Sequence, residues 1–117
     1  MMLLKLRIWD EQLSVMKYSD TAEDWNWDMV VAAQKKDQVM VCTGLTDASG
    51  RLLYEGDYVR VFNTYKELPY NAQLIYKNAQ FVLETETLTT HNRWINYELQ
   101  YIGNHFETPG LLQQSNG

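Results

Sequence analysis

YEGDYVRVF, residues 54–62, decides the fold class, because its last five residues alternate with the period of a β-strand. Val59 and Val61 fall on one face of such a strand, and the residues between and beside them fall on the other. Ahead of the strand, Gly56 can adopt backbone conformations that other residues resist, and the carboxylate of Asp57 can accept hydrogen bonds from turn amides. The tripeptide Glu-Gly-Asp therefore predicts a corner at which a strand begins.

Further short stretches of apolar and β-branched residues lie on both sides of this corner, and polar turns separate them. Several short strands with tight turns are typical of a small antiparallel sandwich or barrel, so the sequence predicts a mainly β protein. Thr108 and Pro109 offer a cap and a first helical position, which predicts a short C-terminal helical turn over residues 109–113. The additional predicted strands cover residues 39–41, 52–54, 72–77, 81–88 and 95–102.

The N-terminal part combines one clear pattern with one ambiguous pattern. Leu4, Leu6 and Ile8 alternate with basic residues and a second apolar segment follows a polar turn, which predicts a β-hairpin within the first twenty residues. Residues 19–36 carry two competing periodicities. A strand fits Trp25, Trp27, Met29 and Val31, whereas one apolar face of a helix fits Trp25, Met29, Ala32 and Ala33. The sequence leaves helix and strand open for this segment.

Composition and charge limit the classes of function. The 117 residues suit one small domain or a small domain with an extension, and they include ten Lys and Arg against fifteen Asp and Glu, a net charge of -5. This acidic balance disfavours nucleic-acid binding and opposes binding to anionic lipid surfaces. A single cysteine, Cys42, cannot form an intramolecular disulfide, and no segment has the length and hydropathy of a membrane-spanning helix. We therefore expect a cytoplasmic protein without membrane contact.

The titratable residues do not form a recognisable catalytic or metal site. His91 and His105 have no second ligand at metal-binding spacing, and Cys42 has no flanking cation that would activate a thiolate. Glu84 and Glu86 share one strand face, where a solvated surface is a better account than a carboxylate pair. We expect no catalytic residues, no metal and no cofactor, and hence no enzyme.

Aromatic residues are in excess, with four Trp, eight Tyr and three Phe. Most are needed to fill a small core, but Tyr58 and Arg60 share a strand face, and Arg93 and Trp94 follow a polar bend. Together these four residues are the candidate binding face. The alternative is that Trp94 plugs one end of a barrel.

Three blocks of the sequence resemble the YopX family of phage and prophage proteins: LKLRIWDEQLSVMKY, CTGLTDASGRLLYEGDYVRV and YIGNHFETPGLL. The middle block is the most specific, although Cys42 stands where an aromatic residue is common. The family is functionally uncharacterised, so the resemblance implies no activity and assigns no catalytic or binding residues. The residues that match its motif, which we expect to be structural, are Gly44, Asp47, Gly50, Tyr54, Glu55, Gly56 and Asp57.

The resemblance implies a phage- or prophage-encoded cytoplasmic protein. It divides the chain into a β-rich N-terminal region, residues 1–42, and an SH3-like β-barrel with a short tail, residues 43–117. If a strand-rich interval follows the first hairpin in the family, the resemblance favours a strand over a helix for residues 25–31. We expect a non-enzymatic protein-binding or self-assembling module. The alternatives are a factor that binds single-stranded nucleic acid through the aromatic and basic face, and an acidic protein that counters a host factor.

Overall fold

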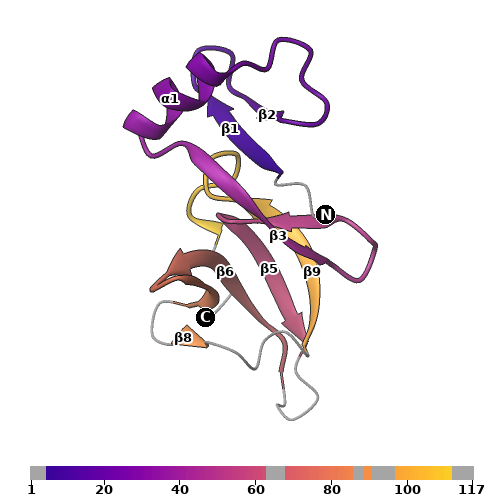
Figure 1. Ribbon diagram of the computed structural model, residues 1–117. Helices are drawn as coiled ribbons and strands as arrows, with labels where there is room; N and C mark the ends of the chain where they lie inside the picture. The colour runs from indigo at the N-terminus through magenta and orange to yellow at the C-terminus, as the bar shows by residue number, and fades with distance from the viewer. Residues whose placement is uncertain (1–4, 63–67, 86–88, 91–96, 112–117) are drawn as a thin grey trace. The chain divides into compact units, whose positions relative to one another are not determined.

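The computed structural model describes residues 5–62, 68–85, 89–90 and 97–111 (Figure 1). The protein is mainly β, and the described residues contain one short α-helix, α1 (Trp27–Lys35). By its internal contacts, the chain divides into two compact units, residues 1–42 and 43–117.

In the first unit, the central strand β1 (Leu6–Asp10) pairs antiparallel with β2 (Val15–Tyr18) and with the start of β3 (Val39–Thr46). Ile8 lies opposite Lys17 of β2 and opposite Val39 of β3, and its side chain is buried. Between β1 and β2, the Asp10 carboxylate accepts two backbone hydrogen bonds from the turn, as its residue type favours.

The segment that the sequence left ambiguous contains a helix, so the preference for a strand over residues 25–31 was wrong. Asn26, in an extended conformation, caps the helix and accepts a hydrogen bond from the backbone N–H of Met29 at 3.0 Å. Val30 and Ala33 are three residues apart and form the buried face of α1. The cap and the helical spacing of the buried residues explain why the 3.6-residue period prevails.

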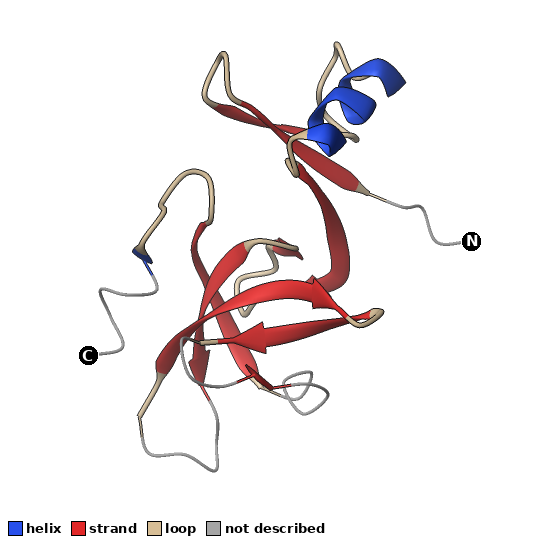
Figure 2. Ribbon diagram, turned by 90° about the vertical axis from the view of Figure 1, so that its left-hand side faces the viewer, coloured by secondary structure: helices blue, strands red, loops and turns tan. Residues whose placement is uncertain are grey.

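The second unit is built around a five-stranded antiparallel sheet with the strand order β8-β7-β6-β5-β9. Figure 2 shows that this sheet is curled, in the manner of half a barrel. The short β4 pairs instead with β3, at the end of the other sheet. The bounds are β4 (Leu52–Tyr54), β5 (Asp57–Phe62), β6 (Tyr70–Lys77), β7 (Gln80–Glu84), β8 (Thr89–Thr90) and β9 (Glu98–Asn104).

These strands follow the predicted β stretches with shifted ends. Residues 86–88 and 95–96, which the sequence assigned to strands, lie outside the described residues. The predicted helical turn over residues 109–113 lies partly outside them, and its described part begins with a turn in which the Leu111 N–H donates to the Thr108 carbonyl.

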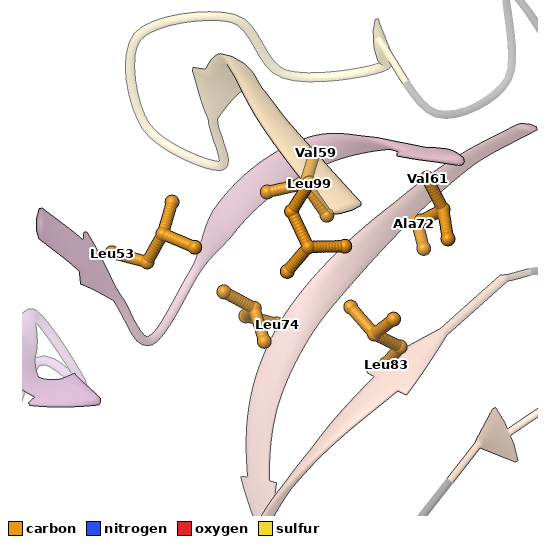
Figure 3. Close-up of a cluster of buried hydrophobic side chains, with 7 residues drawn as sticks. All are labelled: Leu53, Val59, Val61, Ala72, Leu74, Leu83 and Leu99. Carbon is orange, nitrogen blue, oxygen red and sulfur yellow. The ribbon is translucent and has the colours of Figure 1, made fainter. Parts of the chain in front are cut away.

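The core of the second unit is a cluster of aliphatic side chains on the inner face of the curled sheet and on β4 (Figure 3). Val59 and Val61, the alternating valines of β5, both belong to it and are fully buried. Tyrosine and phenylalanine side chains pack around its margin. The cluster consists of Leu53, Val59, Val61, Ala72, Leu74, Leu83 and Leu99.

Candidate functional site

Asp47, in the turn between β3 and β4, is buried and organises the backbone around it. Its Oδ1 atom accepts hydrogen bonds from the Ser49 N–H at 2.9 Å, the Ser49 hydroxyl at 2.8 Å and the Arg51 N–H at 2.9 Å. Its Oδ2 atom accepts a hydrogen bond from the Tyr101 N–H at 3.0 Å. Burial by itself would raise the pKa of this carboxyl, but these hydrogen bonds outweigh burial and lower the pKa to about 2. Asp47 therefore stays ionised at neutral pH and acts as a hydrogen-bond acceptor for the backbone.

The same turn also covers part of an edge strand. β9 is the last strand of its sheet, and the Ala48 N–H donates to the Leu99 carbonyl of β9 at 2.8 Å. Together with the bond from Tyr101 to Asp47, this contact occupies backbone groups of the strand. Occupied edge groups reduce pairing with foreign strands, so the turn protects this edge.

The corner before β5 is tied together by backbone and carboxylate hydrogen bonds. Gly56 has a φ of 91°, which favours glycine, and its N–H donates to the Leu74 carbonyl of β6 at 2.7 Å. The Gly56 carbonyl accepts from the His105 N–H at 3.0 Å. The Oδ2 atom of the fully buried Asp57 accepts from the Tyr54 N–H at 2.7 Å. These bonds fix the point at which β5 begins.

The remaining motif residues lie in the same two turns or beside them. Gly44 in β3 and Gly50 in the turn after Asp47 have φ values of 82° and 90°. Tyr54 is buried at the end of β4, and Glu55 is half-buried in the corner. None of these positions gathers side chains around an open reactive site among the described residues.

In the candidate binding face, the prediction that Tyr58 is exposed is wrong. Tyr58 is only 4% exposed, and burial raises the pKa of its hydroxyl, so its ring is not available for stacking. Arg60 is half-buried, and its Nη1 atom donates to the Oδ1 atom of Asn71 at 2.9 Å. Arg93 and Trp94 lie outside the described residues. The reason for the error is that both faces of β5 are covered near its start, which strand alternation cannot reveal.

The other titratable candidates have ordinary surroundings. His105 is exposed and makes an edge contact with Phe106, and Cys42 is half-buried. Glu84 pairs with Lys77 at 3.4 Å, whereas Glu86 and His91 fall outside the described part of the chain. Among the described residues, no group of three or more His, Cys, Asp or Glu side chains could hold a metal ion.

The outer face of α1, which we define as Trp27, Val31 and Gln34, presents a different candidate site. Trp27 is 72% exposed and Val31 is 37% exposed, one turn apart on the helix. The helical pattern considered from the sequence did not find this pair, because it placed Trp25 and Met29 on the apolar face. The signal that could have found it is Asn26, because a cap there starts the helix at Trp27.

Comparisons with known proteins agree with this mainly β structure. The solved structure of protein EF1440 from Enterococcus faecalis is similar with a TM-score of 0.60 and 20% sequence identity, over 96% of this chain and 99% of that chain. At this identity the similarity concerns the fold alone. No curated protein matches the sequence. The described part of the chain contains no helix with the length and hydropathy to cross a bilayer. The sequence model of the YopX protein family matches residues 5–113, and the chain therefore belongs to the YopX family.

Proposed function

We propose that this protein is a non-enzymatic protein-binding or self-assembling module, and that it makes contact through the outer face of α1. The observation that carries the proposal is the 72% exposure of Trp27 on an ordered helix. A tryptophan side chain carries about 150–250 Å² of surface, mostly apolar, and tryptophan is enriched among the residues that dominate binding energy at interfaces. Covering this side chain with a partner would therefore be favourable.

The hydrogen bonds to Asp47 and Asp57 support a structural role for the second unit. Both carboxylate oxygens of Asp47 accept hydrogen bonds, and Asp57 accepts one from the chain at the corner before β5. We infer that this unit is the scaffold, of the SH3-like barrel type, and that the protein works in the cytoplasm of a bacterial cell that carries a phage or prophage. The family membership and the curled sheet support this inference.

A pull-down with crosslinking, from a lysate of the bacterial host, tests the proposed function. The tagged parent should recover a protein, either a host or phage component or an untagged copy of the chain, and Trp27→Ala should lose it. The matched control is Leu68→Ala, which removes a side chain that is 78% exposed in the second unit. Because Trp27 is mostly exposed, its replacement should change the free energy of unfolding by less than about 0.5 kcal/mol. Equal recovery by the parent and Trp27→Ala would reject this surface.

A further inference from the structure

The outer face of α1 has the spacing of a helix-pairing seam. Trp27, Val31 and Gln34 follow one another at intervals of four and three residues, the spacing by which one helix packs along another. Asp28 and Lys35 are seven residues apart, so they lie on the same flank of this seam. All five residues are exposed.

The two charged residues on this flank differ from most charged residues elsewhere in the first unit in their ion pairing. Asp28 and Lys35 make no ion pair with any described residue, and two helical turns, about 10 Å along the axis, separate them. Other carboxylates of the unit are matched with lysines: Asp20 with Lys5, Asp10 and Asp24 with Lys17, and Glu11 with Lys36. Within the described part of the chain, the flank of the seam therefore has an acid without an ion-pair partner at its start and a base without one at its end.

We propose that a second copy of this chain covers the outer face of α1, with the two helices antiparallel about a twofold axis. This proposal rests on the proposed function and names its partner. In an antiparallel pair the start of each helix lies opposite the end of the other, so Asp28 faces Lys35 of the partner subunit, and the twofold axis repeats the pair. In a parallel pair this flank would face the opposite flank of the partner helix, so Asp28 and Lys35 would not meet across the seam. The charge pattern thus complements itself in the antiparallel arrangement.

The length of the helix limits the strength of this contact. Nine residues span about 14 Å, and interfaces of stable complexes bury about 1,200–2,000 Å² in total. A single helix pair is smaller than such an interface, so the dimer is weak and exchanges rapidly. We expect a dissociation constant on the order of 100 µM at low salt.

Sedimentation velocity of the full chain, over a concentration series from about 10 µM to about 1 mM at low salt, tests the proposal. The weight-average sedimentation coefficient of the parent should rise from the monomer toward the dimer value. Trp27→Ala should weaken association by about tenfold or more, because the variant loses the largest side chain of the seam. Leu68→Ala, the exposed leucine control of the second unit, should associate like the parent.

Charge reversal identifies the arrangement and the occupant together. Asp28→Lys and Lys35→Asp should each remain monomeric, since each sets two like-charged pairs across the twofold axis. A one-to-one mixture of the two variants should recover association, because every Lys then faces an Asp in the heterodimer. Circular dichroism of each variant checks that α1 is retained. If a charge variant loses its helix, the Trp27→Ala variant still tests whether the outer face of α1 mediates association.

Two results would rule out a second copy of the chain as the partner of α1. One is a parent that stays monomeric over the whole series, and the other is a mixture that associates no better than the separate variants. Neither result would by itself reject the proposed function. A parent that stays monomeric but still captures another protein through Trp27 would leave the proposed function standing. Loss of both self-association and Trp27-dependent capture would reject both proposals.

Discussion

The two units of this protein use their apolar residues differently. In residues 43–117, seven aliphatic side chains form one buried cluster across β4, β5, β6, β7 and β9. In residues 1–42, the buried apolar side chains of the described part are few: Ile8, Val30, Ala33 and Met40. Both units leave some large apolar side chains mostly exposed: Trp27 and Leu13 in the first, and Leu68 and Tyr76 in the second.

The acidic residues of the two units also differ in where they lie and in what they contact. In the second unit, buried carboxylates hold the backbone of the turns at Asp47 and Asp57. In the first unit, several charges meet near the surface, where Lys17 contacts Asp10 at 3.2 Å and Asp24 at 2.7 Å. Ion pairs near the surface contribute little to stability, whereas backbone hydrogen bonds to buried carboxylate oxygens fix the conformation of the turns. The second unit therefore has the character of a scaffold, and the first presents a surface.

Leu74→Ala should produce the largest effect, because Leu74 is fully buried in the cluster of the second unit. Removing its side chain leaves a cavity and should lower the free energy of unfolding by about 2–5 kcal/mol. Urea denaturation followed by far-UV circular dichroism measures the change. Leu68→Ala removes the same atoms at the surface and should stay within about 0.5 kcal/mol of the parent. Similar losses in the two variants would contradict a specific core.

Gly103→Ala should cost about 3 kcal/mol, because the new Cβ atom would stand 2.2 Å from Oγ1 of Thr108. That hydroxyl accepts from the Asn104 N–H and donates to the Asn104 carbonyl, both at 3.0 Å, so it cannot rotate away without losing bonds. Thermal and urea denaturation measure the loss. In the control Gly44→Ala the Cβ meets nothing within 4 Å, and only the left-handed backbone, at a φ of 82°, costs about 1–2 kcal/mol. A smaller loss at position 103 than at 44 would refute the close contact.

Acid should weaken the second unit through Asp47. The folded pKa of about 2 lies below the ordinary value of 3.8, so the stabilisation is present above pH 4 and is lost as the pH falls toward 2. The shift corresponds to at most about 2.5 kcal/mol, at about 1.4 kcal/mol per pKa unit. Urea denaturation at a series of pH values measures this slope, and Asp47→Asn should remove much of it while lowering stability at pH 7. An unchanged slope in the variant would assign the acid sensitivity to other carboxyls.

Asn26→Ala should have the smallest effect of the series, a loss of about 1 kcal/mol, because it removes the cap of α1. Hydrogen exchange at the backbone N–H groups of the first helical turn measures the fraying directly. Asn26→Ser retains a capping oxygen and should protect the turn almost as well as the parent. If Asn26→Ala exchanges no faster there, the helix depends on packing alone.

Strand β5 and its corner were accessible to sequence reasoning because their signals are local. Alternating Val59 and Val61 indicated a face toward the core, and the structure buries both. Position 58 was misjudged because alternation does not show whether a second face is also covered. The bond from Tyr101 to Asp47 joins residues 54 positions apart, so no local pattern could predict the partner.

Helix α1 shows why the candidate site was missed. Two periodicities of similar strength overlap between residues 19 and 36, and propensity alone does not choose between them. The choice depends on the cap at Asn26 and on packing of Val30 and Ala33, of which only the cap is visible as a residue type. Without the start of the helix, Trp27 could not be placed on its outer face.

Site-specific photocrosslinking in living cells tests most directly whether the outer face of α1 is a contact surface. A photoreactive phenylalanine analogue replaces Trp27 in one variant and Leu68, the exposed side chain of the second unit, in the other. If the outer face of α1 is a contact surface, position 27 should form a protein adduct, to a second copy of the chain or to another protein, and position 68 should form much less. Equal adduct yields at the two positions, or none from position 27, would contradict the proposed contact surface.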